Sequence, residues 1–367
     1  MAWYLDAARE DEVSSVRVIL GDYGSGKTHF LRMTSHMALE RRFFVSEVTL
    51  SRDVRLDRFD TVWRGLLASL ASPESRGKPE GIQEVLNRWC SSLAEEPEEV
   101  DQRLGALDDI NGLDPDFRQA LRGYANAYFT QGDRDSYLQW LKGDAVRPPG
   151  IRAKIDRASA RAMLRSLILF LKHIGYSGLV LFLDELELIR DQGAKARDAN
   201  YDVLRQFVDD ADNLPSFLLL CSVTPQMITD DNKGFPSYPA LWQRLGRMMN
   251  TIEGDYRALV VDLSRSSLRD EDLVELALKI RQIYLVAMGM NVDERVPSSF
   301  IQNTLIPKLR EQESELPMIR RTVSTTIAIL ETLDQNPNMR AEEVLAQALN
   351  KAVEDIYEQE QRRHRNW

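Results

Sequence analysis

The chain has 367 residues, of which 43% are hydrophobic and 28% are charged, and its formal net charge is −10. This composition is typical of a globular protein with a well-covered core, and no apolar run is long enough to cross a bilayer. The acidic balance excludes the global positive field of a protein that coats DNA. Four carboxylates within Met1–Ser15 argue against a signal peptide, and two cysteines give neither a disulfide framework nor a zinc spacing. We therefore expect a cytoplasmic protein without a membrane segment.

The first fifty residues predict a strand, a loop, a helix and a second strand. Residues 16–20 (VRVIL) form a short β-branched run that ends at a glycine, which indicates a buried strand. A glycine-rich loop follows at Gly21–Gly26, and helical apolar spacing runs from Thr28 to about Arg41. Residues 44–50 (FVSEVTL) then read as a second strand. This order is typical of the start of a doubly wound α/β sheet.

Residues 57–175 predict helices and loops almost throughout. A stretch of this length is too long for one connection, so we interpret it as a helical insertion. Its strongest break is Pro148-Pro149-Gly150, and its last helix, at about Asp156–Ile174, returns the chain to the sheet.

Beyond the insertion, three further strands alternate with helices. The uninterrupted apolar runs 179–183 (LVLFL) and 217–223 (FLLLCSV) fit central parallel strands that are buried on both faces. The remaining elements are helices at about Tyr201–Asp210 and Pro239–Met249 and a fifth strand at Ala258–Leu263. No strand pattern follows Ser264. The expected helices there are Glu271–Met288, Ser298–Glu313, Met318–Asp334 and Ala341–Glu360.

Gly21 to Thr28 (GDYGSGKT) match the phosphate-binding loop G-x-x-x-x-G-K-[ST]. Glycines allow the backbone to fold around phosphates and to direct N–H groups inward, and the start of the following helix adds its dipole. Lys27 would reach the β- and γ-phosphates, and the hydroxyl of Thr28 would bind Mg²⁺. The predicted cofactors are ATP and Mg²⁺. The residues predicted to contact the nucleotide are Gly21, Asp22, Tyr23, Gly24, Ser25, Gly26, Lys27, Thr28 and His29.

Asp184-Glu185 directly follows the apolar run 179–183 and is the second part of the predicted site. Open α/β sheets bind their ligands at the carboxyl ends of the strands, and this pair stands at such an end. Asp184 would hold Mg²⁺, directly or through water, and Glu185 would orient and polarise the attacking water. An apolar run followed by two carboxylates is a weak signal alone. Together with the phosphate loop it predicts a nucleoside triphosphatase.

Further polar groups are expected near the γ-phosphate. Ser222 and Thr224, at the end of the run 217–223, are candidates to sense it, although a strand-end turn would explain them equally well. Arg244, or Arg247 as second choice, could reach a neighbouring subunit's nucleotide as an arginine finger. Arg320, or alternatively Arg321, could fold back onto the phosphates from the C-terminal helices. Surface arginines on amphipathic helices are the competing account.

Residues 147–165 contain six cations and a single carboxylate. Such a stretch could meet nucleic acid or an acidic partner, and a solvated helix face is the competing account.

The order of these motifs resembles the AAA+ superfamily, nearest to its origin-recognition-like branch. More narrowly, the stretches GDYGSGKTHFLR, VSEVTLSRDV and FLDELELIRD resemble the ATP-binding proteins of bacteriophage-exclusion (BREX) systems, the BrxD-like group. The resemblance implies a sheet order of 5-1-4-3-2, a C-terminal helical lid, and an ATPase that works in antiphage defence beside a methyltransferase and other large partners. Met318 follows Pro317 where the lid pattern has Pro-Arg, no winged-helix pattern follows the lid, and the usual N-terminal helix is short or missing.

The sequence therefore predicts an α/β P-loop NTPase of AAA+-like fold, with a parallel sheet, a large helical insertion and a C-terminal helical lid. The expected boundaries are 1–56 for the first part of the ATPase domain, 57–155 for the insertion, 156–264 for the second part and 265–367 for the lid.

The leading functional hypothesis is a remodelling or assembly ATPase of a defence system that acts with DNA-modifying partners. It would be a homo-oligomer or part of a complex with other defence proteins, with DNA as a candidate ligand. Alternatives are a nucleotide-gated scaffold with little hydrolysis and a DNA loader or translocase, against which the net charge weighs. A small-molecule kinase also has a P-loop, but an acidic pair at a strand end suits water activation better.

Overall fold

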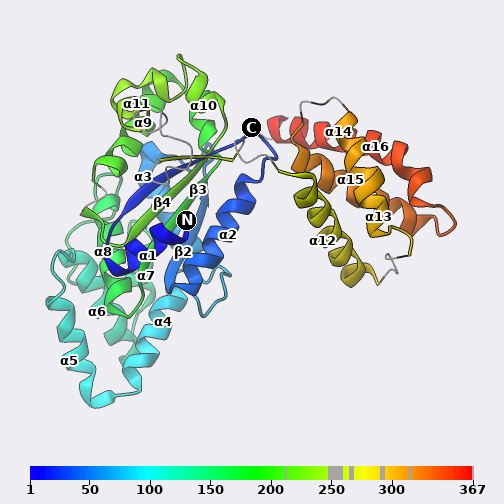
Figure 1. The fold of residues 1–367 in the computed structure, drawn as a ribbon. Helices are drawn as coiled ribbons and strands as arrows, with labels where there is room; N and C mark the ends of the chain where they lie inside the picture. The colour runs from blue at the N-terminus through cyan, green and yellow to red at the C-terminus, as the bar shows by residue number, and fades with distance from the viewer. Residues whose placement is uncertain are drawn as a thin grey trace. The chain divides into compact units, whose positions relative to one another are not determined.

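A computed structural model of the chain is shown in Figure 1. It describes residues 1–210, 213–246, 259–263, 268–289, 294–312, 314 and 316–365. These residues divide into two compact units, Met1–Leu20 with Thr28–Val261, and Gly21–Lys27 with Asp262–Trp367. Each unit is described by itself.

The first unit is built around a five-stranded sheet. The strands are β1 (Ser15–Leu20), β2 (Phe43–Thr49), β3 (Gly178–Asp184), β4 (Phe217–Val223) and β5 (Val260–Asp262). Their spatial order is β2-β3-β4-β1-β5, with β1, β2, β3 and β4 paired in parallel, and the amide of Val18 on β1 donates to the carbonyl of Leu259 beside β5 at 2.7 Å. The sheet order implied by the family resemblance is confirmed.

Helices precede, connect and cover these strands. Those of the first unit are α1 (Ala2–Glu10), α2 (Lys27–Glu40), α3 (Phe59–Ser69), α4 (Gly81–Ala94), α5 (Val100–Gly105), α6 (Pro115–Thr130), α7 (Asp135–Leu141), α8 (Ala160–His173), α9 (Ala194–Asp209), α10 (Gln226–Thr229) and α11 (Pro239–Gly246). The predicted insertion corresponds to α3 to α7, and α4, α5 and α6 lie at the opposite end of this unit from α10 and α11 (Figure 1). The short 3-10 segments η1 (Leu56–Arg58) and η4 (Leu186–Asp191) also matter below.

The sheet and the insertion share one hydrophobic core. Every residue of β3 and β4 is buried, which explains why both strands are apolar without alternation. Trp89 of α4 packs edge-on against Phe170 of α8, with ring centroids 5.1 Å apart, and the indole of Trp63 on α3 donates to the carbonyl of Leu141 at 2.8 Å. These contacts tie the insertion helices to one another and to α8, and their buried residues belong to the same hydrophobic cluster as those of the sheet.

The C-terminal helices have a separate core. They are α12 (Asp270–Met288), α13 (Ser298–Phe300), the π-helical turn η8 (Ile301–Leu305), α14 (Ile306–Glu311), α15 (Met318–Gln335) and α16 (Ala341–Arg365). The single helix expected at Ser298–Glu313 is interrupted by the π turn. Pro307 has no N–H to donate to the preceding turn, which favours such a local change in the hydrogen-bonding pattern.

Three helices differ from the prediction. Helix α9 begins at Ala194 rather than at about Tyr201. Helix α1, which the apolar pattern did not reveal, occupies nine residues before β1, so the N-terminal helix is short rather than missing. Helix α8 begins at Ala160, not at Asp156. The carboxylate of Asp156 accepts from the amides of Ala158 and Ser159 at 3.0 and 3.2 Å, and this turn delays the helix.

Candidate nucleotide-binding site

The phosphate loop connects the end of β1 to the start of α2. Gly24 and Gly26 have φ angles of +79° and +96°, a region that residues with a Cβ rarely adopt. Lys27 is 8% exposed, and its ammonium donates to the carbonyls of Gly21 at 2.9 Å and Asp22 at 3.2 Å. The loop therefore curls around the amine of its own lysine.

The other residues of the loop differ in their exposure and contacts. Asp22 and Tyr23 are exposed, and the ammonium of Lys27 lies 5.1 Å from the centroid of the Tyr23 ring. The hydroxyl of Ser25 occupies space beside Gly21, where an added Cβ would approach it to 2.2 Å. His29 is exposed on the first turn of α2.

Asp184, the last residue of β3, is bound by hydroxyl groups from two other elements. The hydroxyl of Thr28 donates to Asp184 Oδ2 at 3.1 Å, and the hydroxyl of Ser222 donates to Asp184 Oδ1. The amide of Glu185 also donates to Asp184 Oδ1, at 3.0 Å. Parallel register explains this convergence, because strands β3, β4 and β1 all end at the same edge of the sheet.

Glu185 begins the turn that leaves the sheet. Its backbone is left-handed, with φ 61° and ψ 37°, and its side chain is half-buried. This conformation is uncommon for a residue other than glycine, asparagine or aspartate. Such strained residues cluster at functional sites. The strain therefore supports a functional hypothesis for this glutamate.

Ser222 and Thr224, the two candidates at the end of β4, have different contacts. Ser222 lies within the strand, is fully buried and contacts Asp184. Thr224 is also buried, but it lies just beyond the strand, where Pro225 begins a turn. The hydrogen bond to the predicted magnesium ligand thus comes from Ser222.

Arg244 lies on α11 and forms an ion pair within its own chain. Its guanidinium donates to both carboxylate oxygens of Asp209, at 2.8 Å for Nη2, and about a third of the side chain is exposed. Arg247, the second choice for an arginine finger, lies outside the described residues.

Arg320 and Arg321 have different environments within the second unit. Arg321 is 4% exposed and donates to the carbonyl of Leu309 at 2.8 Å and to the side chain of Gln312 at 3.0 Å, and burial lowers the pKa of its guanidinium. The side chain of Arg320 instead lies against the phosphate loop. A Cβ added to Gly24 would come within 2.4 Å of Arg320 Cδ. Of the two residues, Arg320 is therefore the one at the loop.

A polar network that the sequence analysis missed joins the segment after β2 to α9. Asn200 is fully buried. Its carbonyl accepts from the amide of Asp57 at 2.9 Å, and its amide donates to Gln192 Oε1 at 3.0 Å. Arg55 holds the carboxylate of Asp57 at 2.7 Å. Isolated polar residues in helical segments give no sequence signal for such a bridge.

The donor set suits a magnesium ion. Within the described ranges, no group of three or more His, Cys, Asp or Glu side chains could hold a metal. Mg²⁺ prefers oxygen ligands and usually takes one or two from the protein, with phosphate and water completing the octahedron. The hydroxyl of Thr28 and the carboxylate of Asp184, already within hydrogen-bonding distance, are such ligands.

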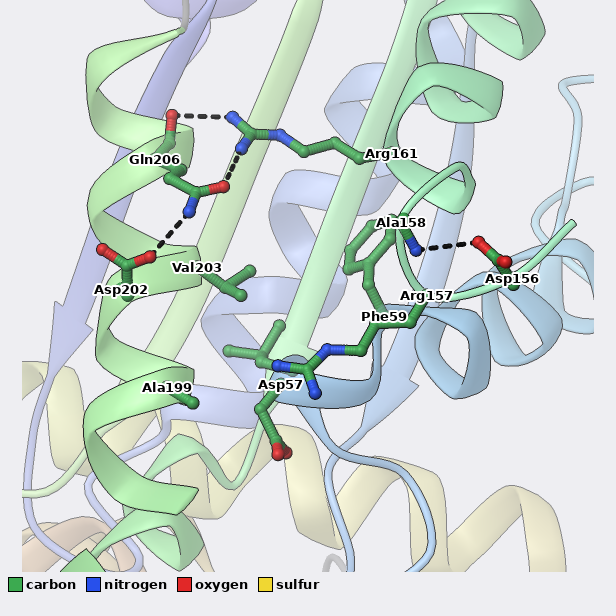
Figure 2. Close-up of a pocket in the computed structure, with 11 residues that line it drawn as sticks. Asp57, Phe59, Asp156, Arg157, Ala158, Arg161, Ala199, Asp202, Val203 and Gln206 are labelled. Carbon is green, nitrogen blue, oxygen red and sulfur yellow. Dashed lines mark hydrogen bonds between the residues drawn. The ribbon is translucent and has the colours of Figure 1, made fainter. Parts of the chain in front are cut away.

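A separate cavity of about 490 Å³ lies between η1, the start of α8 and α9 (Figure 2). Neither the phosphate loop nor the acidic pair lines it. Its lining residues are Leu56, Asp57, Phe59, Asp156, Arg157, Ala158, Arg161, Ala199, Asp202, Val203 and Gln206. It is therefore not the predicted nucleotide site.

Three features define the class of P-loop NTPases. A glycine-rich loop lies between the first strand and a helix, the carboxylate at the end of β3 is hydrogen-bonded to the threonine after that loop, and the sheet order is 5-1-4-3-2. Within this class the chain belongs to the family described as BREX system ATP-binding protein BrxC/D, whose model matches residues 5–349. The recognition made from the sequence is thereby confirmed.

Comparisons with solved structures and with curated proteins gave two further results. The Walker-type ATPase of Pyrococcus abyssi is similar in structure, with a TM-score of 0.39 and 12% identity over 99% of this chain and 74% of that one. No curated protein matches the chain. Among the described residues, no helix is both long and apolar enough to span a membrane.

Proposed function

We propose that this protein is a Mg²⁺-dependent ATPase that remodels or assembles a BREX-type antiphage defence complex in the cytoplasm, together with DNA-modifying partners. The observation that carries the proposal is the set of hydrogen bonds that Thr28 and Ser222 make to Asp184. Family membership supports ATP binding, and the strand-end carboxylates support hydrolysis.

The residues of the loop would bind the triphosphate. Amides of Gly21–Gly26 and the first turn of α2 would face the phosphate oxygens, and the ammonium of Lys27 would exchange its carbonyl partners for them. Thr28 and Asp184 would hold Mg²⁺, which neutralises phosphate charge when bound. Ser222 would keep the carboxylate of Asp184 in place.

Glu185 would orient and polarise the attacking water. Arg320, from the C-terminal helices, would contact the nucleotide above Gly24. Arg244 remains the candidate finger toward a neighbouring subunit, and this role would require it to leave Asp209. A homo-oligomer or a complex with other defence proteins would supply that neighbour.

The decisive experiment measures phosphate release and ATP binding for the wild type, Glu185→Gln and the control Asp191→Asn. Asp191 is an exposed carboxylate at the end of the same turn. We expect Glu185→Gln to bind ATP normally and to lose about 10²–10³-fold in kcat, as for the removal of one group that stabilises a transition state. The control should keep its rate.

A wild type that binds ATP but releases no phosphate under any condition would contradict the proposed hydrolysis. The protein would then be a nucleotide-gated scaffold. Stimulation of the rate by duplex DNA would point to a motor or a remodeller.

A further inference from the structure

The connection between α7 and α8, from Lys142 to Ser159, contains no helix or strand. Irregular connections longer than roughly 12–15 residues are uncommon in compact domains, and those with a fixed conformation are usually functional. This one is fixed. Pro148, Ile151 and Ile155 are buried, and the indole of Trp140 donates to the carbonyl of Ala153 at 2.8 Å.

Basic side chains project from this connection and from the start of α8. Arg147, Arg152, Lys154, Arg157 and Arg165 are exposed and form no ion pair among the described residues. These five residues are called the basic surface below. Arg161 differs, because it binds Gln206 and, at 2.6 Å, the carboxylate of Asp210. Figure 2 shows this contrast at the cavity: hydrogen bonds join Arg161 to Gln206, and none reaches the guanidinium of Arg157.

Contacts with α6 bring the two halves of the basic surface together. The amide of Arg152 donates to the carboxylate of Asp116 at 3.2 Å. A Cβ on Gly112 would lie 2.8 Å from Arg165 Nη2, so this guanidinium covers the loop that leads into α6. Both cations therefore lie near the beginning of the same helix.

Three carboxylates close to the basic surface accept hydrogen bonds from other groups. Asp116 accepts from the amides of Arg152 and Ala153, and Asp156 accepts from the amides of Ala158 and Ser159. Asp57, in the cavity, is held by Arg55. Within the part of the chain that the structure describes, the cations of the basic surface thus form no ion pair, although the chain as a whole has a net charge of −10.

We propose that the basic surface binds the phosphate backbone of duplex nucleic acid. The exposed residues between its cations are small or cyclic (Pro149, Gly150, Ala153, Ala158 and Ala162) apart from one carboxylate, Asp156. A stable protein interface needs a buried apolar or aromatic anchor, whereas binding to phosphates needs positive charge and guanidinium geometry. The chemistry therefore favours a polyanion over an acidic protein. The inference goes beyond the proposed ATPase and does not require nucleotide.

The test uses the full chain and a fluorescent duplex of about 30 bp in the absence of ATP, with anisotropy recorded across a salt series. The variant combines Arg152→Ala, Lys154→Ala and Arg157→Ala. The matched control combines Lys78→Ala, Lys195→Ala and Lys233→Ala, which removes the same charge from exposed positions elsewhere. We expect the variant to bind at least about tenfold more weakly, with the log–log salt slope reduced by about 2–3, and the control to bind like the wild type.

Equal binding by the variant and the wild type would overturn the proposal. So would a wild type that ignores duplex DNA but binds poly-glutamate through the same three residues, because the partner would then be an acidic protein. A Lys27→Ala chain should keep its DNA affinity, so a failure of the ATPase proposal is distinguishable from a failure of this one.

Discussion

The carboxyl edge of the sheet and the basic surface both present charged groups, but the surroundings of those groups differ. At the sheet edge, Asp184 is bonded by Thr28 and Ser222, and Lys27 is bonded by loop carbonyls. On the basic surface, Arg152 and Arg157 are exposed and form no ion pair with any residue that the structure describes. The charged groups of the first region are already hydrogen-bonded to neighbouring side chains or to the loop. The cations of the second region are exposed to solvent.

Removing Lys27 should have the largest effect at the sheet edge. We expect Lys27→Ala to weaken ATP binding by at least about 100-fold, equivalent to about 2.7 kcal/mol, because the charged contact with the phosphates is lost. Isothermal titration with ATP and Mg²⁺ measures this change. The exposed Lys78→Ala is the control, and unchanged ATP affinity in Lys27→Ala would refute the assigned nucleotide site.

The roles of Ser222 and Thr224 can be distinguished by measuring the rate of ATP hydrolysis in variants of each. Ser222→Ala should lower kcat by about tenfold, since the hydroxyl that holds Asp184 accounts for about 1.4 kcal/mol in such a change. Thr224→Val, which keeps the shape of a buried side chain without the hydroxyl, should change kcat less. The reverse order of the two rates would move the sensing role to Thr224.

The smallest change in activity is expected for Arg320 and Arg321 of the C-terminal helices. Arg320 should affect ATP binding, whereas Arg321 should affect the stability of the fold. Arg320→Ala should weaken ATP binding a few-fold and leave unfolding unchanged, because its side chain lies over Gly24. Arg321→Ala should cost about 1–3 kcal/mol of stability, because it leaves the buried carbonyl of Leu309 without its donor. Urea unfolding and ATP titration of both variants test this. Equal stability of the Arg320→Ala and Arg321→Ala variants would contradict a role for Arg321 in the packing of the C-terminal helices.

Much of the fold could be predicted because its signals are local. Apolar runs that end at Gly21 and Asp184 marked strands β1 and β3, and the helical period marked α12, α15 and α16 within a few residues. A local signal failed where a side chain overrode it, because Asp156 delayed the start of α8. The helix expected around Pro307 forms, with a π turn at Ile301–Leu305.

By itself, the sequence determined the class of the protein, the phosphate loop and the acidic pair, because a loop that must fold around phosphates allows few residue types. Only the tertiary structure decided which residues contact one another. It placed Ser222 rather than Thr224 on Asp184 and Arg320 rather than Arg321 at Gly24, and it joined Asn200 of α9 to Asp57 of η1. These choices depend on strand register and on the direction in which a helix faces, which bring together residues that are distant in the chain and of ordinary type.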